Sequence, residues 1–263
     1  MNTLKDVVTV GKLNRPPRVL LYGVEGIGKS TFGASALNPI IIQTESGLDE
    51  IDAPKFPLAA SFDDVMNSLK LLGTESQGSK TVVIVSIDWR EPLIWADTCA
   101  RHAQPNIEAF GYAKGYKHAM DGWSRLLLAL DRLRDEKGMA ILLIGHAEID
   151  RFDSPDTEPY DRYQLKLHDA ATAKITEWCD VVGFVNYQVF TEKTDVGFNR
   201  KISRGKGGGD RMMYLEERPA YKAKNRYSLP WELPFLRGEA WNTLVTAIKA
   251  SRVVTTTNET EGV

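Results

Sequence analysis

The sequence contains few cysteines, and their positions do not suggest a shared structural role. Cys99 and Cys179 are the only two among 263 residues, and neither belongs to a Cys-x-x-Cys or Cys/His pattern. A disulfide framework and a structural zinc site are therefore not expected, and the composition favours an intracellular protein. The sequence also lacks the ~18–20 consecutive apolar residues that span a bilayer, and the apolar core of a signal peptide. We therefore expect a cytoplasmic protein without a membrane partner.

A strong excess of one charge is missing as well. The net charge is −2, with 43% hydrophobic and 26% charged residues, which is ordinary for a globular protein. Any polyanionic partner must therefore meet a local basic patch, because the surface as a whole is not basic. The length suits one large α/β domain, alone or with a small appendage.

Short apolar runs alternate with segments of helical spacing up to about residue 150. The runs predict buried strands at 18–22, 40–43, 81–86 and 139–144. The segments between them predict helices at 29–36, 61–72, 91–101 and 118–137. Strands that alternate with helices form a mostly parallel sheet covered on both faces, so we expect an α/β fold.

Other segments carry weaker signals. The sequence predicts irregular loops at 102–117 and 150–168, a helix at 170–178, a strand at 181–190 and a hairpin at 198–214 that turns around Gly205 to Gly209. We expect an N-terminal segment (1–16), one main domain (17–240), a C-terminal helix (241–254) and a disordered tail (255–263).

A complete phosphate-binding motif lies between the first predicted strand and the first predicted helix. Its residues fit G-x-x-x-x-G-K-[ST] in full, followed by Thr31: Gly23, Val24, Glu25, Gly26, Ile27, Gly28, Lys29 and Ser30. The glycines let backbone N–H groups turn inward around phosphate oxygens, and the helix N-terminus adds positive potential. Lys29 is expected to reach the β- and γ-phosphates and the Ser30 hydroxyl to hold Mg²⁺. The sequence therefore predicts that the protein binds a nucleoside triphosphate, most simply ATP.

A carboxylate that such sites usually carry is absent. P-loop enzymes usually place an acidic residue at the end of a second buried strand, where it holds the magnesium shell. Here that position is Val85, followed by Ser86, and the nearest carboxylate in sequence is Asp88. Asp88 can curl back and serve, Ser30 and water can hold the metal alone, or Val85 is a natural or introduced loss of function. We favour weakened metal binding with retained nucleotide binding, because Lys29 and the loop backbone act on phosphate independently.

Two polar residues follow other predicted strands. In parallel α/β sheets, ligands bind at the carboxyl ends of the strands. Glu45 follows the second strand, so it is expected to face the γ-phosphate and to orient and deprotonate an attacking water. His146 follows the fourth strand and is expected to hydrogen-bond the γ-phosphate. The alternatives are a surface-loop glutamate and an ordinary strand-end histidine.

A basic stretch occupies residues 200–226. It contains nine basic residues against three acidic ones, a local charge of +6, and several tyrosines. The basic residues are Arg200, Lys201, Arg204, Lys206, Arg211, Arg218, Lys222, Lys224 and Arg226. Cations that bind phosphate and rings that stack on bases suit single-stranded DNA, and the alternative is a solvated hairpin. The aromatic and basic segments 102–117 and 151–166 are further candidates.

Four features together resemble the RecA-like nucleotide-binding proteins of phages, some of which are single-strand annealing or recombination ATPases. These are the P-loop, the Thr44 to Gly47 turn, the Gly-His-Ala at His146 and the late Ala-Lys-Asn-Arg-Tyr-Ser-Leu-Pro, and the resemblance covers roughly residues 15–240. It implies a RecA-like P-loop core with a C-terminal β-hairpin extension. It also implies DNA-contacting loops near 102–117 and 150–168.

The segment Lys224-Asn225-Arg226-Tyr227-Ser228 is similar to the Lys-Asn-Arg-Phe-Gly motif of the RadA/Sms branch of RecA relatives. That resemblance implies that Lys224 and Arg226 reach the nucleotide of a neighbouring subunit, so that the site is complete only in a homo-oligomer, a ring or a filament. The family places a carboxylate at Val85, so weak or oligomer- or DNA-dependent ATP turnover is expected.

The leading functional hypothesis is therefore an ATP-binding protein that binds single-stranded DNA and promotes annealing or strand pairing in phage recombination, in the host cytoplasm. A nucleotide or small-molecule kinase and a nucleotide-binding scaffold without turnover are the alternatives. The sequence shows no lid with clustered arginines, which disfavours the kinase.

Overall fold

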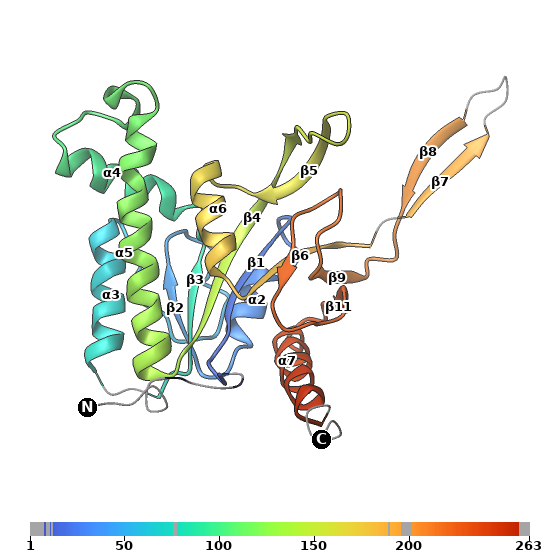
Figure 1. Ribbon diagram of the computed structural model, residues 1–263, viewed down its shortest axis with the longest axis horizontal. Helices are drawn as coiled ribbons and strands as arrows, with labels where there is room; N and C mark the ends of the chain where they lie inside the picture. The colour runs from blue at the N-terminus through green and yellow to red at the C-terminus, as the bar shows by residue number, and fades with distance from the viewer. Residues whose placement is uncertain are drawn as a thin grey trace.

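The buried apolar runs form the parallel centre of the sheet. The computed structural model describes residues 8, 11, 13–75, 78–188, 190–195 and 201–257. Its parallel strands are β1 (Arg18–Gly23), β2 (Pro39–Gln43), β3 (Thr81–Val85), β4 (Ala140–Phe152) and β6 (Val181–Tyr187). They lie in the order β6-β1-β4-β3-β2, and each neighbouring pair is parallel (Figure 1). This confirms the mostly parallel α/β fold expected from the sequence.

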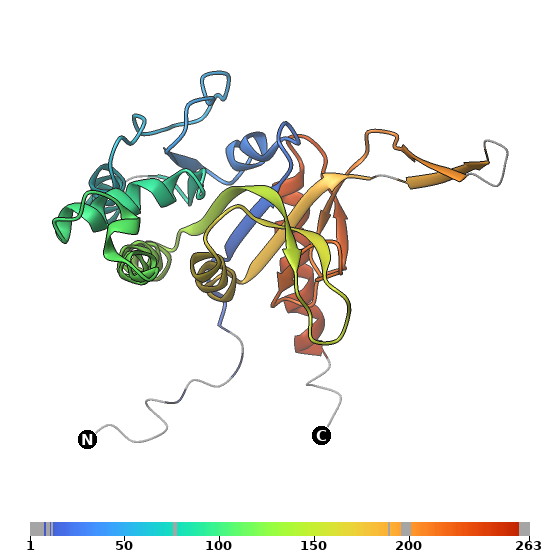
Figure 2. The same cartoon turned by 90° about the horizontal axis from the view of Figure 1, so that it is seen from above.

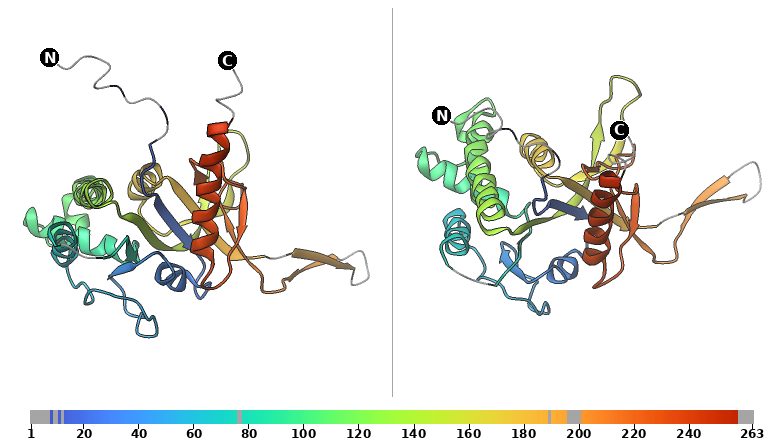
Figure 3. Two further views of the ribbon diagram at one scale, coloured as in Figure 1. Left: turned by 90° about the horizontal axis from the view of Figure 1, so that it is seen from below. Right: turned by 60° about the horizontal axis from the view of Figure 1, so that its bottom comes forward.

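Helices cover both faces of this sheet (Figures 2 and 3). One face packs against α3 (Phe62–Thr74), α4 (Arg90–Arg101), α5 (Lys114–Lys137) and α6 (Asp169–Trp178). The other packs against α2 (Lys29–Ala34) and α7 (Ala240–Thr257). Because side chains alternate along a strand, Leu20 joins the first apolar cluster and Leu21 the second. This double burial explains why the strands are continuous apolar runs.

Short antiparallel strands extend this frame. Next to β6, β9 (Arg211–Tyr214) and β11 (Glu232–Pro234) widen the sheet, and β10 (Lys224–Asn225) pairs with the start of β6. The prediction of an irregular loop at 150–168 is wrong, because β4 continues to Phe152 and pairs with β5 (Tyr160–Leu165) as a hairpin. Beyond Ile144 this strand leaves the covered part of the sheet and becomes polar, so no apolar run marks it.

The predicted hairpin at 198–214 also needs correction. Strands β7 (Phe190–Asp195) and β8 (Lys201–Lys206) pair with each other, and Figures 1 and 2 show them projecting from the body. Gly205 lies within β8 opposite Thr191, and β9 returns to the central sheet. The segment from Gly205 to Gly209 therefore ends the projecting arm and begins the return path to the sheet. Residues 196–200, between β7 and β8, lie outside the described residues.

The predicted 102–117 loop contains more helix than expected. A 3₁₀ turn, η1 (Ile107–Phe110), precedes α5, which begins at Lys114. Gly115 lies inside α5, where a Cβ would come 2.1 Å from the Ile107 carbonyl oxygen. The glycine therefore permits a close approach of backbone to helix.

The ends of the chain differ slightly from expectation. Strand β6 ends at Tyr187, before the predicted residue 190. Helix α7 covers the predicted C-terminal helix 241–254 and continues to Thr257, so the disordered tail predicted at 255–263 overlaps it. Residues 258–263, like most of the predicted N-terminal segment, lie outside the described part of the chain. Among the helices that are described, none is both long and apolar enough to cross a membrane.

Arg90, the first residue of α4, is an unusual side chain for a protein interior. It is 0% exposed, and Ile94 and Thr98 on the same helix face are equally buried. None of its guanidinium nitrogens has a hydrogen-bond partner among the described residues. Burial lowers the pKa of Arg90 to about 9, so the charged form still predominates at neutral pH at a cost to folding.

We therefore expect Arg90→Leu to raise the free energy of unfolding by at least ~1 kcal/mol, because it removes a buried unpaired charge and keeps an apolar side chain in its place. Urea denaturation measures this difference. The control is Arg101→Leu on the same helix, where the exposed arginine pairs with Asp97 and Asp121 and a change of no more than about 0.5–1 kcal/mol is expected. A lower free energy of unfolding in Arg90→Leu than in wild type would contradict the inference that the buried charge destabilises the fold.

Candidate nucleotide-binding site

The P-loop leaves the carboxyl end of β1 in a conformation that depends on its glycines. Gly26 and Gly28 have φ angles of 70° and 108°, which side chains rarely adopt. A Cβ on Gly23 would lie 2.2 Å from the Val185 carbonyl oxygen of β6. Gly23 therefore lets the loop start close against the neighbouring strand, and Gly28 leads directly into α2.

The P-loop lysine lies folded along this loop. Lys29 Nζ donates hydrogen bonds to the carbonyl oxygens of Gly23, at 3.0 Å, and Val24, at 2.8 Å. Burial lowers the pKa of Lys29, although the charges of Asp88 and Glu45 act in the opposite direction. A phosphate in the loop would offer the ammonium a charged acceptor in place of neutral carbonyls, which is the stronger hydrogen bond.

The polar groups predicted at separate strand ends converge beside Lys29. Glu45 follows β2, Asp88 follows β3 and His146 lies in β4, paired opposite Gly23. Asp88 Oδ1 accepts hydrogen bonds from Ser86 Oγ at 2.8 Å and from the His146 backbone N at 3.0 Å. Asp88 Oδ2 lies 2.9 Å from His146 Nδ1. The strand order therefore places all of these groups at one edge of the sheet, as the sequence predicts.

Electrostatics couple the members of this cluster. Burial raises the pKa of Glu45, against the opposing effects of His146 and Lys29, which makes its carboxylate more basic. The hydrogen bond to Asp88 raises the pKa of His146. In the protonated form both ring nitrogens carry hydrogens, so Nε2 can donate to an anion while Nδ1 holds Asp88. The cluster thus combines a base with cationic donors.

Val85 occupies the apolar side of this arrangement. It is 1% exposed and belongs to the cluster that contains Ile27 and Phe32 of the P-loop and α2. An acidic residue here would therefore point to the P-loop face of the sheet, which supports the sequence-based assignment of the position. Asp88 comes from the following turn, and both of its oxygens already contact Ser86 or His146.

The residues present fit a magnesium ion that is held mainly by its nucleotide. Among the described residues, no three His, Cys, Asp or Glu side chains are grouped to hold a metal. Mg²⁺ bound through phosphates needs only one or two protein ligands and keeps several waters. Ser30 at the start of α2 and Asp88 remain the predicted ligands, and Asp88 must give up existing contacts to serve directly.

Lys224 and Arg226 lie away from the chain's own P-loop. Strand β10 pairs with Val181 and Val182 at the start of β6, whereas the P-loop follows the end of β1. Lys224 Nζ donates to the carbonyl oxygens of Thr176 and Glu177, and Arg226 donates to Glu177 O at 2.7 Å and to Asp180. Within one chain these two side chains therefore cap the C-terminal end of α6.

Arg211 is a residue near the P-loop that the sequence did not single out. Its Nη1 donates to the Ile27 carbonyl oxygen at 3.1 Å, and its guanidinium lies 5.9 Å from the ring centroid of Tyr187. In the sequence, Arg211 stands out only as one of the nine basic residues of the stretch 200–226. The pairing of β9 with β6 brings it to the loop, and no local motif could have shown this.

The described members of the basic stretch do not form one patch. Arg211 lies at the P-loop, Arg218 stacks over Trp231 at 5.4 Å, and Lys224 and Arg226 cap α6. Arg200 and the side chains of Lys201, Arg204 and Lys206 lie outside the described part of the structure. The fold thus separates the described basic residues, and binding of single-stranded DNA by the stretch stays a prediction.

Comparison with known proteins identifies the family of this chain. A family model described as an AAA domain matches residues 15–227. The chain belongs to this AAA domain family. Family membership supports nucleotide binding at the P-loop. The crystal structure of the RadB recombinase is similar with a TM-score of 0.47 and 14% identity, and the match covers 85% of this chain and 90% of that chain. No curated protein matches the sequence.

The Asp88–His146 pair gives a pH-dependent prediction. Folding raises the pKa of His146 above its ordinary 6.5, so the pair stabilises the fold below that pH and the contribution is lost as pH rises through the raised value. Asp88→Asn removes the negative charge, so we expect the pKa of His146 to fall. NMR titration of the imidazole measures this pKa, with Asp121→Asn at an exposed position of α5 as the control. An unchanged pKa in Asp88→Asn would show that the carboxylate does not hold the ring.

Proposed function

We propose that the protein binds ATP with Mg²⁺ at the P-loop and uses it to bind and pair single-stranded DNA as a homo-oligomer. The observation that carries this proposal is the convergence of Lys29, Glu45, Asp88 and His146 at one edge of the sheet. Membership of the AAA domain family supports the nucleotide, and the resemblance to phage RecA-like proteins supports DNA annealing or strand pairing in the cytoplasm.

Each polar group of the site receives a role from its chemistry. Lys29 exchanges its loop carbonyls for the β- and γ-phosphates. Ser30 would hold the magnesium ion directly, and Asp88 would act on it through the metal's water molecules while it keeps its contacts with Ser86 and His146. Mg²⁺, when bound, neutralises phosphate charge. Glu45 orients a water and takes its proton, which its raised pKa favours. Protonated His146 donates from Nε2 to the γ-phosphate while Asp88 fixes the ring.

A neighbouring subunit completes the site in this proposal. Lys224 and Arg226 cannot serve their own P-loop, because they lie at the opposite end of the parallel strands. Arg226 keeps 48% of its side chain exposed, so it is accessible to a second copy. In an oligomer the two cations would approach the neighbour's phosphates in place of the α6 carbonyls.

A nucleotide-binding scaffold without turnover is the second candidate, and buried Val85 favours it. The two candidates are separated by Val85→Asp, which places a carboxylate on the P-loop face of β3. We expect this variant to release phosphate from ATP at least tenfold faster than wild type in the presence of Mg²⁺, because a metal ligand is restored. The matched control is Val83→Asp, which puts the same charge on the same face further from the strand end and brings no gain in turnover. If neither wild type nor Val85→Asp hydrolyses ATP with DNA present, the scaffold is favoured.

DNA binding is the part of the proposal that salt can test directly. The arm β7–β8 carries basic residues in its sequence, and the segments 102–117 and 150–168 are the other predicted contacts. We expect a fluorescent single-stranded oligonucleotide to bind with an affinity that falls steeply as salt rises, because phosphate contacts release counterions. ATP is expected to change that affinity in wild type and not in Lys29→Ala, whose P-loop has lost its cation. Absence of binding at low salt, with and without ATP, would contradict the proposed function.

A further inference from the structure

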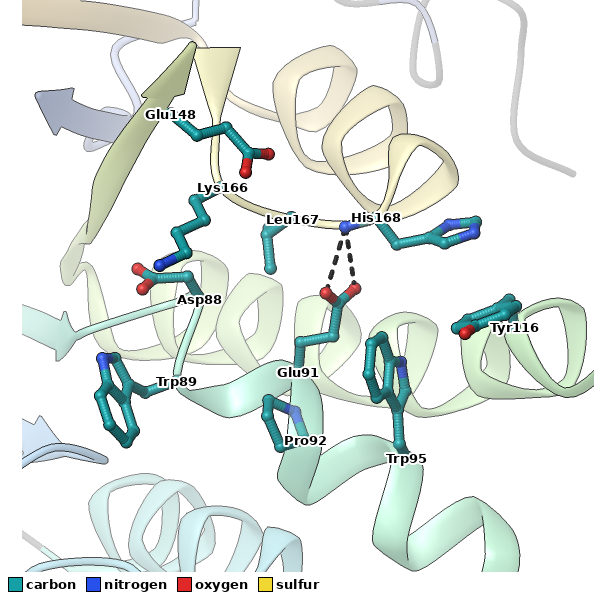
Figure 4. A pocket seen from close by; sticks show the side chains of 10 residues that line it. All are labelled: Asp88, Trp89, Glu91, Pro92, Trp95, Tyr116, Glu148, Lys166, Leu167 and His168. Carbon is teal, nitrogen blue, oxygen red and sulfur yellow. Dashed lines mark hydrogen bonds between the residues drawn. The ribbon is translucent and has the colours of Figure 1, made fainter. Parts of the chain in front are cut away.

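A cavity of about 510 Å³ lies beside the nucleotide site, and Asp88 forms part of its lining (Figure 4). Its lining comes from the turn and first helical turns after β3, from the start of α5, from β4 and from the link between β5 and α6. The volume lies within the range of small-ligand sites. Nothing in the proposed roles of Lys29, Glu45 and His146 uses this space.

The walls of the cavity are largely aromatic. Trp95 packs edge-on against Tyr116 with ring centroids 5.3 Å apart, and Tyr116 stacks on His168 at 4.5 Å. Trp89 lines the same cavity and remains 57% exposed, a high value for so large an apolar side chain. The Trp95–Tyr116–His168 stack is a preformed wall, whereas Trp89 offers a ring face to a ligand that enters from solvent.

The polar groups between these walls are both donors and acceptors. Figure 4 shows the Glu91 carboxylate directed at the His168 backbone N, which donates to both of its oxygens at 3.3 and 3.1 Å. Lys166 supplies an ammonium, and Glu148 supplies a second carboxyl group. Burial raises the pKa of Glu91 to about 7 and also raises that of Glu148. The carboxyl groups disfavour an anion, and together with the Lys166 ammonium they offer hydrogen-bond acceptors and a donor to an uncharged polar ligand.

An uncharged, flat ligand with hydrogen-bonding edges has the chemistry of a nucleobase. We propose that this cavity binds one unstacked base of single-stranded DNA, an inference that rests on the proposed DNA-binding function. The base stacks on Trp89 and directs its hydrogen-bonding edge at Glu91, Glu148 and Lys166. The sugar-phosphate backbone stays outside the cavity, away from the carboxyl groups. Cytosine and adenine carry an exocyclic amino group, which can donate a hydrogen bond to a carboxylate. Thymine instead presents two carbonyl acceptors, one on each side of a single N–H. The pocket therefore prefers cytosine and adenine.

The position of the pocket connects the base to the nucleotide site. Asp88 lines the cavity and also holds His146. Glu91 joins the first turn of α4, just after Asp88, to the start of α6. A base that contacts Glu91 is therefore connected to Asp88, which holds His146 and lies only three residues earlier in the sequence.

The test uses the full chain and oligonucleotides of equal length made of deoxycytidine or deoxythymidine, plus one oligonucleotide carrying a single fluorescent 2-aminopurine. We expect wild type to bind oligo-dC several-fold more tightly than oligo-dT and to quench the 2-aminopurine. Trp89→Ala should weaken oligo-dC binding by about tenfold, the scale of one lost base stack, and reduce the quenching. The control Trp231→Ala, which removes the other exposed tryptophan away from the cavity, should change neither. Glu91→Gln keeps the volume and should narrow the preference for dC over dT.

Each other outcome has a distinct meaning. If wild type binds oligonucleotides but Trp89→Ala binds them equally well with the same quenching, the base pocket is wrong and the proposed DNA binding stands. If wild type binds no single-stranded DNA, both are overturned. If the guanidinium compound agmatine quenches tryptophan fluorescence in wild type and not in Trp89→Ala, while oligonucleotide affinity is unchanged, the cavity is a site for a cationic side chain and the base pocket is overturned.

Discussion

The parallel pairing of β1 with β4 is the constraint on which the site depends. It sets Gly23, where the P-loop begins, directly opposite His146. The next pairing, β4 with β3, brings the turn that carries Asp88 to the same edge, and β2 adds Glu45. Because every one of these strands runs in the same direction, polar residues that follow apolar runs must meet, although more than one hundred positions separate Lys29 from His146 in the sequence.

The Asp88–His146 pair changes the meaning of the missing carboxylate at Val85. In the expected arrangement one acidic residue at the strand end would serve the metal. Here the acidic residue lies in the following turn, and its oxygens are occupied by Ser86 and His146. The negative charge is therefore retained near Lys29, but it orients the His146 imidazole and favours its protonated form. In the proposed function, binding of phosphate and activation of water therefore depend on different residues.

The fold also separates functions that the sequence places side by side. Arg211 and Lys224 are close neighbours in the basic stretch, but β9 carries Arg211 to the P-loop and β10 carries Lys224 to the end of α6. The opposite also occurs. Tyr116, Glu148 and His168 come from three elements and line one cavity with Asp88. The edge of the sheet thus has a phosphate-binding side and an aromatic side, which share a single carboxylate.

The sequence by itself determined the parallel strands, the helices on both faces and the P-loop residues, because long apolar runs and a motif of fixed spacing are local signals. It also located Glu45, Asp88 and His146, since ends of parallel strands share one edge. Only the tertiary structure decided that Asp88 binds His146, that Arg211 reaches the loop and that Arg90 is buried without a described partner. It also decided that 150–165 is a hairpin and that the glycines at 205–209 lead out of an arm. These features depend on contacts between distant segments, which spacing along one segment cannot encode.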